Sequence, residues 1–185
     1  MKRIKNILYL ALIICCTGCT TWAVLEGGQA EFKDTGFKAS MPKGWMGYMP
    51  ADGFMATKDG YSLNHISVQK IKFLQRLTNT KKRFQIGMLL HEILEVEIDS
   101  IKSNKMTFFI NIIKNHPITI DGLEAYRLEY EYEEKGGLKV KAIQCGFIYN
   151  DHVYRISFKA AKLHYYEATI EDFEKFLKSF KLLKV

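Results

Sequence analysis

Apolar and charged side chains alternate along residues 124–133, and this alternation constrains the fold more than any other feature of the sequence. The apolar positions are Tyr126, Leu128, Tyr130 and Tyr132, and the residues between them are Arg127, Glu129, Glu131 and Glu133. Successive side chains of a strand point to opposite faces, so a period of two predicts a strand with one well-buried face in an antiparallel sheet.

A Lys-Gly-Gly turn at 135–137 follows this strand and predicts a hairpin. The turn places Glu133 opposite Lys139 and Glu131 opposite Lys141, so two pairs of opposite charge share one face. Further segments have strand-like composition and are bounded by turn residues. They are residues 30–33, 37–41, 54–58, 62–71, 106–115, 118–120, 138–149 and 153–159.

Two amphipathic helices are predicted, over 80–104 and 163–183. The apolar face of the first holds Ile86, Leu89, Leu90, Ile93, Leu94 and Ile101. The apolar face of the second holds Tyr166, Ile170, Phe173, Phe176, Leu177 and Phe180, and a stripe of this kind faces a core. Together these elements predict an α+β fold, a mainly antiparallel sheet flanked by helices.

Glu97 falls in the middle of the apolar face of the helix 80–104. A buried carboxylate must find a partner or stay protonated. We therefore expect a salt bridge, or a side chain that extends to solvent near the helix end, in preference to a functional carboxylate. Trp45, at the end of the strand 37–41, is interpreted as a core residue rather than a ligand-stacking one.

The N-terminus has the composition of an export signal. Lys2, Arg3 and Lys5 form a positive start, and residues 7–14 are apolar. The apolar segment is too short for a membrane-spanning helix, which needs roughly 20 residues. Residues 1–18 are therefore predicted to be a signal peptide.

Residues 16–19, Cys-Thr-Gly-Cys, resemble the lipobox of bacterial lipoproteins, although Cys16 stands where that family usually has leucine. The resemblance implies cleavage between Gly18 and Cys19 and attachment of lipid to the Cys19 thiol. Two or more acyl chains hold a protein stably on a membrane, whereas one does not. Because Thr20 and not aspartate follows, the resemblance implies the outer membrane in a host with two. The alternative is an ordinary secretory signal that leaves Cys19 as a free thiol.

The predicted organisation is a tether at 19–29 and a globular domain at 30–185. The formal charge of +7 falls to +4 once the leader is removed, and the basic residues are scattered among acids. A protein that binds nucleic acid would carry a contiguous basic face. We therefore expect no nucleic-acid partner.

Cys145 is the cysteine that remains beyond Cys19, so disulfide bonds cannot hold the domain together. We expect it mid-strand, on the face opposite Leu128 and Tyr130 and near Ser157. Without a cationic neighbour to lower its pKa, the thiol should be inert.

A zinc-protease motif is incomplete in this sequence. His91 begins the sequence His-Glu-Ile-Leu-Glu, but the motif needs a second histidine at the fifth position, where Glu95 stands. The remaining histidines are dispersed: His65, His116, His152 and His164. The sequence also lacks a nucleophile elbow, a phosphate loop and a dinucleotide fingerprint. We therefore predict no catalytic residue, no metal site and no cofactor.

Several short motifs resemble those of the PsbP-like superfamily. They are Gly-Phe at 36–37, Met-Pro-Lys-Gly-Trp at 41–45, Gly122 with Ala-Tyr at 125–126, Val-Tyr-Arg-Ile-Ser-Phe at 153–158, and Phe176 with Ser-Phe-Lys at 179–181. The superfamily includes the photosystem II extrinsic subunit, a small Ran-binding nuclear-transport protein and DcrB-type bacterial lipoproteins. The resemblance covers most of 30–183 and implies an α/β/α sandwich that works as an accessory or binding module without catalysis.

Three functions follow as hypotheses. The first is a lipid-anchored, extracytoplasmic accessory protein of the cell envelope, held on the membrane by acylated Cys19 and binding a protein or another envelope component. The second is an envelope hydrolase with dispersed catalytic residues, which a cleft holding Glu97 beside His65 or His116 would favour. The third is a carrier of lipid or a small molecule, which an apolar cavity of several hundred Å³ would favour.

Overall fold

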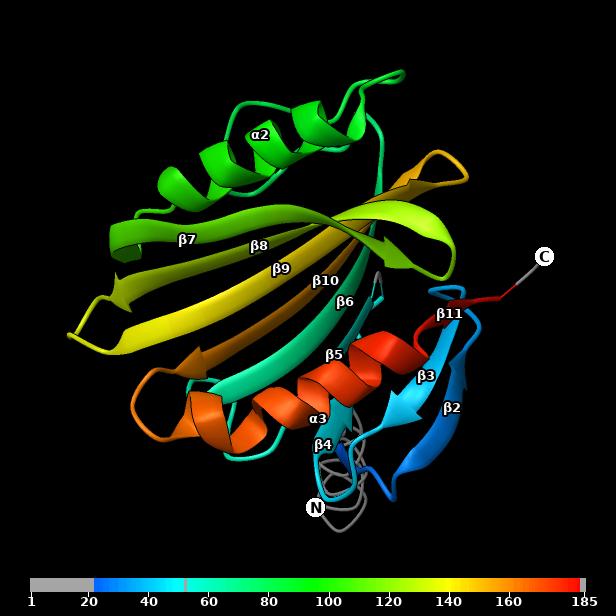
Figure 1. Ribbon diagram of the computed structural model, residues 1–185, viewed down its shortest axis with the longest axis vertical. Coiled ribbons are helices and arrows are strands. Elements are labelled where there is room, and N and C mark those ends of the chain that lie inside the picture. Colours follow the sequence, from blue (N-terminus) through cyan, green and yellow to red (C-terminus); the bar gives the residue numbers. More distant parts are fainter. Residues whose placement is uncertain (1–21, 52, 184–185) are drawn as a thin grey trace, which may run out of the picture.

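The computed structural model describes residues 22–51 and 53–183, and within them eight strands form an antiparallel main sheet (Figure 1). The strand order is β1-β4-β5-β6-β10-β9-β8-β7. Their bounds are β1 Ala23–Val24, β4 Met46–Tyr48, β5 Gly53–Thr57, β6 Asn64–Lys72, β7 Thr107–Ile120, β8 Leu123–Glu134, β9 Lys139–Tyr149 and β10 His152–Ala161. The predicted signal peptide and Cys19 lie outside the described residues.

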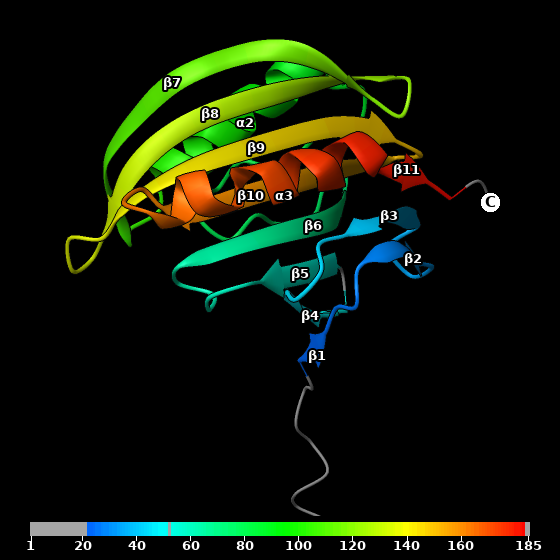
Figure 2. The same ribbon diagram turned by 60° about the horizontal axis from the view of Figure 1, so that its bottom comes forward.

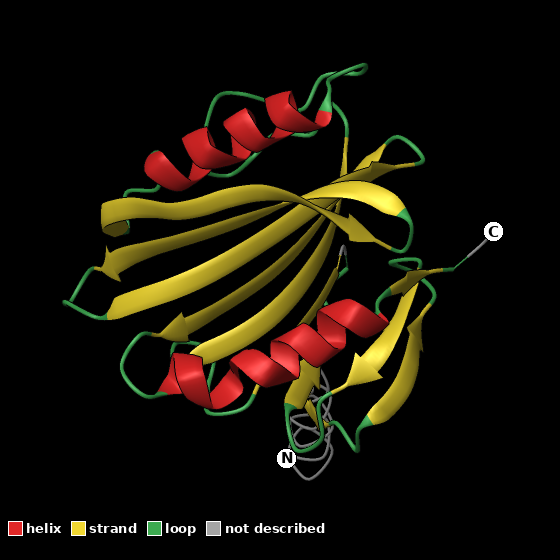
Figure 3. Ribbon diagram, viewed as in Figure 1, coloured by secondary structure: helices red, strands yellow, loops and turns green. Residues whose placement is uncertain are grey.

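Two helices cover opposite faces of this sheet (Figures 2 and 3). Helix α2 (Leu90–Lys102) contacts β7, β8 and β9, whereas α3 (Tyr165–Ser179) contacts β6 and β10. A second sheet lies beside α3 and is ordered β11-β3-β2, with bounds β11 Lys181–Leu182, β3 Phe37–Met41 and β2 Gly28–Phe32. This arrangement confirms the predicted α+β class with a mainly antiparallel sheet between helices.

Each face of the main sheet has its own hydrophobic core. The α3 side is aromatic and fully buried at Trp45, Phe37, Phe54, Phe147, Phe158, Phe173 and Phe176. The α2 side holds Ile93, Leu94, Val96, Phe84, Leu128, Tyr130, Tyr132 and Val140. Among the described residues, no helix is long and apolar enough to span a bilayer.

The predicted hairpin register is confirmed. Glu133 pairs with Lys139 and Glu131 pairs with Lys141 across β8 and β9. The alternation along β8 also has the predicted meaning, since Leu128, Tyr130 and the other apolar positions are buried toward α2. The register is strictly defined, because in a pleated strand a one-residue slip would turn every apolar side chain to the other face.

Helix α2 is shorter than the predicted helix 80–104, which is a correction. Phe84 is fully buried as part of a loop, and Gly87 has a φ of +85°, which interrupts right-handed helical geometry. Ile86 and Leu89 are 74% and 60% exposed, so neither belongs to the buried face as predicted. Tertiary packing of Phe84 therefore overrides a periodic pattern that extends over the whole segment.

Other boundaries also differ from the predictions. The helix 163–183 ends at Ser179, and Phe180 is extended so that β11 can pair with β3. The predicted strands 106–115 and 118–120 form one strand, β7, because Pro117 lies on an edge strand where its missing N–H costs no ladder bond.

The predicted tether 19–29 is also shorter than expected. Ala23–Val24 forms β1 and pairs with β4, and β2 begins at Gly28. Between the two strands, the Leu25 N–H donates to the Trp45 carbonyl at 2.7 Å, and the Gly44 N–H donates to the Leu25 carbonyl at 2.9 Å. These backbone pairs attach the segment to the domain.

Candidate functional site

Glu97 is 1% exposed and forms the predicted salt bridge. Its Oε1 accepts hydrogen bonds from Nε and Nη2 of Arg155 at 2.9 and 2.7 Å. The remaining guanidinium donor, Nη1, bonds Oε1 of Gln69 at 2.9 Å. Because a carboxylate held in this way is occupied by its counter-ion, Glu97 is poorly placed to act as a free general acid or base.

Arg155 belongs to a row of polar side chains on the α2-facing surface of the sheet. Along β10, Tyr154, Ile156, Phe158 and Ala160 point toward α3, whereas Arg155, Ser157 and Lys159 alternate with them and point the other way. The same surface receives His65 and Gln69 from β6 and Gln144 from β9, through the pairs Lys159–His65, Arg155–Gln69 and Ser157–Gln144. A buried sheet surface is normally apolar, so this row marks a candidate site.

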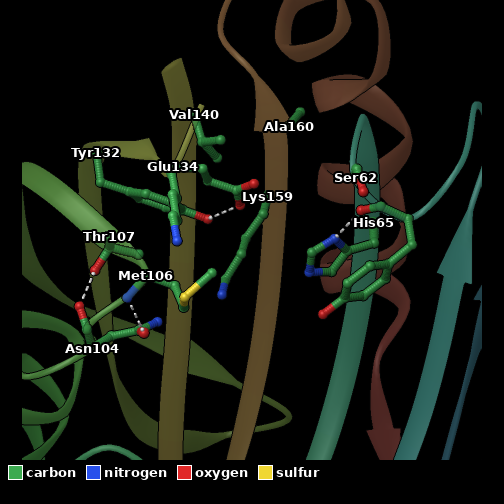
Figure 4. A pocket seen from close by; sticks show the side chains of 12 residues that line it. Ser62, His65, Asn104, Met106, Thr107, Tyr132, Glu134, Val140, Lys159 and Ala160 are labelled. Atoms are coloured by element: carbon green, nitrogen blue, oxygen red, sulfur yellow. Dashed lines mark hydrogen bonds between the residues drawn. The ribbon is translucent and has the colours of Figure 1, made fainter. Parts of the chain in front are cut away.

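A cavity of about 230 Å³ opens at one end of the row (Figure 4). We call it the polar cavity, and it is lined by Tyr61, His65, Thr107, Tyr132, Glu134 and Lys159, among others. Two smaller hollows, of about 100 and 160 Å³, adjoin it. Lys159 lines all three spaces, and Arg155 lines the two smaller ones. Glu97 lines the 100 Å³ hollow, while His65 lines the other two spaces.

His65 is neutral in this setting. Burial, followed by the nearby charge of Lys159, lowers its pKa from 6.5 to about 4. Nδ1 lies 2.9 Å from the carbonyl oxygen of Tyr61, which can only accept, so Nδ1 carries the proton. Nε2 is therefore a hydrogen-bond acceptor. The ring also stacks on Tyr61 with centroids 4.3 Å apart, which fixes its plane.

Lys159 is the less exposed of the two lysines that line the polar cavity. Burial, and then the charge of Arg155, lower its pKa, whereas the charges of Glu134 and Glu97 act in the opposite direction. Within the described part of the chain, Nζ has neither a hydrogen bond nor an ion pair. Sequence reasoning missed this residue because a lysine alternating with apolar residues looks like the solvated face of a strand.

A second hollow lies between the start of α2 and strands β7 and β8. We call it the helix-start groove; its volume is about 370 Å³, and its apolar lining includes Leu89, Leu90, Leu94, Pro117 and Tyr126. His116 also lines it, and in the described residues its buried Nδ1 has no hydrogen-bond partner. Glu97 thus shares neither named cavity with a histidine.

The other candidate residues occupy structural or surface positions. Trp45 is fully buried and its Nε1 donates to Asp172 of α3 at 3.0 Å, which confirms the expected core role. His91 is exposed on α2. Over residues 22–51 and 53–183, no group of three or more His, Cys, Asp and Glu side chains is arranged to hold a metal ion.

Cys145 is fully buried in the middle of β9, on the α3 side and opposite Leu128 as predicted. Its neighbour in β10 is Ile156, whereas Ser157 pairs with Gln144 and faces the other way, which corrects the predicted contact. A cation does lie across from it, because Cys145 pairs with Arg127. Burial nevertheless raises the pKa of the thiol to about 12, and the charges of the two glutamates that pair with Arg127 act in the same direction.

These features define a class of protein, an antiparallel sheet sandwiched between two helices with polar side chains buried on one of its faces. No family model matches the sequence, and no curated protein matches it either. The fold is that of PsbP and Mog1p.

Two solved structures illustrate the similarity. Cyanobacterial PsbP (CyanoP) from Synechocystis sp. PCC 6803 has a TM-score of 0.59 at 13% identity, over 90% of this chain and 95% of that one. The Ran-binding protein Mog1p of Saccharomyces cerevisiae has a TM-score of 0.57 at 9% identity, over 88% and 97%. At these identities the likeness establishes the fold alone.

Proposed function

We propose that this protein is a lipid-anchored accessory protein of the cell envelope, exposed outside the cytoplasm, which acts by binding and not by catalysis. The observation that carries the proposal is the spacing between the lipobox-like cysteine and the fold. Strand β1 begins at Ala23, four residues after Cys19. Four residues span at most roughly 14 Å. Acylation of Cys19 would therefore hold the β1 edge of the main sheet against the bilayer.

The opposite edge would then face away from the membrane. Strand β7 is separated from β1 by the width of the sheet, and Figure 2 shows the two edges at opposite ends of the molecule. On β7, Phe108, Phe109 and Ile113 are 46%, 83% and 45% exposed. An edge strand with unpaired backbone groups and apolar side chains suits an extended segment of an envelope protein. Mog1p, which has the same fold, is itself a binding protein.

The anchor is tested by Cys19→Ala in the full chain. We expect the variant to lose labelled fatty acid and to leave the membrane fraction, because no acyl chain can be attached. Thr17→Ala keeps a small residue before the cleavage site and serves as the matched control. Incorporation of label into Cys19→Ala at the wild-type level would show that the assignment is wrong.

Binding is tested with detergent-solubilised envelope. Immobilised wild-type chain should retain a partner that Phe109→Asp releases, since the charge lies in the middle of the exposed apolar surface. Asn111→Asp on the same strand is the control for the added charge. Repeated failure of the wild-type chain to recover any partner or ligand would count against the proposal.

Catalysis by Glu97 is disfavoured because its carboxylate is already paired with a cation. Glu97 is bonded to Arg155, and His65 lines a different part of the row. A carrier function is the second candidate, favoured by the 370 Å³ helix-start groove. If the groove carries acyl chains, a fluorescent fatty acid should bind the wild-type chain and be lost from Leu94→Glu but not from the surface variant Lys175→Glu.

A further inference from the structure

The charges around the polar cavity do not balance. Arg155 and Glu97 neutralise each other in a hydrogen-bonded pair, and Glu134 accepts a hydrogen bond from the Tyr132 hydroxyl at 3.5 Å. Lys159 and Lys135 also face the cavity, and His65 is neutral. Three cations thus oppose two carboxylates.

Lys159 bears most of this imbalance. It extends from the end of the polar row into the cavity, between Tyr132 and Glu134 on one side and His65 on the other (Figure 4). In the part of the chain that the structure describes, neither carboxylate comes within ion-pair distance of its Nζ. Lys159 is half-buried, and removing an ammonium group partly from water without a counter-ion costs free energy, so this arrangement adds nothing to stability.

The rest of the cavity offers complementary polar groups. Nε2 of His65 is an acceptor, as its tautomer requires, and the hydroxyls of Tyr61 and Thr107 and the amide of Asn104 also line the space. A volume of about 230 Å³ is below the roughly 300–1,000 Å³ of sites for drug-sized ligands. The cavity therefore suits a small, polar molecule rather than a segment of a polymer.

We propose that the polar cavity binds a small anion that also carries a hydroxyl or amine hydrogen. Carboxylate or phosphate oxygens of the ligand accept a charge-assisted hydrogen bond from Lys159 Nζ, and the ligand's hydroxyl or amine donates to His65 Nε2. The ligand thereby supplies a negative charge that balances the ammonium group of Lys159. This site uses neither the lipid anchor nor the exposed apolar side chains of β7, so it goes beyond the accessory role proposed above.

The test is calorimetric titration of the detergent-solubilised full chain with glycerol 3-phosphate, gluconate and inorganic phosphate, with glycerol as the neutral comparison. We expect glycerol 3-phosphate or gluconate to bind and glycerol not to bind. Lys159→Met should weaken the anion about 10- to 100-fold, the range for a hydrogen bond to a charged group. Lys162→Met removes the same charge outside the cavity and should change affinity less than about twofold.

A second readout separates a binding lysine from a structural one. Without ligand, Lys159→Met should melt at the same temperature as the wild type or higher, because it removes an uncompensated cation. Failure of all three anions to bind the wild type, or equal binding by Lys159→Met, would overturn the proposal. If Lys159→Met does not fold, NMR of the wild type decides: the anion must shift the His65 ring signals, and unshifted signals would refute the site.

Discussion

The buried and half-buried ionisable groups of the sheet differ in how their charges are compensated. Glu97 and Arg155 neutralise each other, whereas Lys159 has no counter-ion in the described residues. Cys145, on the aromatic side, is kept protonated by burial. Glu97, Arg155 and Lys159 lie on the same side of the sheet, so the partners of each group, and not its face alone, decide whether it is inert or available to a ligand.

Cys145 should react slowly in the folded protein. Only the thiolate attacks a disulfide reagent, and burial raises the pKa of this thiol to about 12. We expect 5,5′-dithiobis(2-nitrobenzoic acid) to label it quickly in denaturant and slowly in buffer, and Cys145→Ser to leave binding intact. Reactivity at neutral pH above that of a free model thiol would contradict the inert interpretation.

His65 should make stability depend on pH. Its pKa is about 4 when folded and 6.5 in the reference state, so between these values the unfolded chain binds a proton that the folded chain does not. Stability is then full above about pH 6.5 and is lost as the pH falls toward 4, by about 3 kcal/mol in total.

Urea unfolding at about pH 7 and about pH 4.5 measures this loss, of which His65 should account for about 2–3 kcal/mol. His65→Phe keeps a ring against Tyr61 but cannot be protonated, so its stability should fall less between the two pH values. His91→Gln, on the exposed side of α2, is the matched control. An equal loss in His65→Phe and wild type would refute the assignment.

At the scale of elements, the sequence pattern predicts the buried face of α3 better than it predicts the extent of α2. The stripe of α3 is the docking surface, with Phe173 and Phe176 fully buried. The pattern before α2 extends further than the helix, because Phe84 packs as a loop residue and Gly87 interrupts the helical geometry. An apolar period shows which side chains are available for burial, but the neighbours determine which ones are buried.

Phe176→Ala tests the docking of α3. Its ring stacks on Phe54, with centroids 6.2 Å apart, and meets Phe37 edge-on at 6.4 Å. Emptying a fully buried aromatic site of this kind should cost about 3–5 kcal/mol in the free energy of unfolding. Chemical denaturation measures it, and Lys175→Ala, exposed on the same helix, should change stability little. An unchanged melting temperature for Phe176→Ala would show that α3 docks elsewhere.

At the scale of the whole molecule, strand order separates the proposed activities in space. The main sheet begins at β1, next to the predicted lipid site, and ends at β7, where apolar side chains are exposed. The polar cavity lies between these edges, on the face that α2 only partly covers, because α2 contacts β7, β8 and β9. Anchoring, partner binding and anion binding would thus use separate surfaces of one sheet.

The sequence by itself determined the class of fold and the central hairpin. Alternation along β8 and the Lys-Gly-Gly turn depend on local geometry, and they specified the Glu131–Lys141 and Glu133–Lys139 register correctly. It also indicated that Glu97 needs a partner. It did not identify that partner, because Arg155 lies 58 residues away and reaches Glu97 only through the packing of α2 on the sheet.

Only the tertiary structure decided the site. Lys159, His65 and Tyr132 come from different strands, and the local sequences predict Tyr132 only as a buried residue and do not distinguish Lys159 and His65 from solvated polar residues. They converge because β10 lies between β6 and β9, which places polar residues of three strands on one partly covered face. Strand order is set by long-range packing, so a pattern with a period of two can predict each strand but not which strands become neighbours.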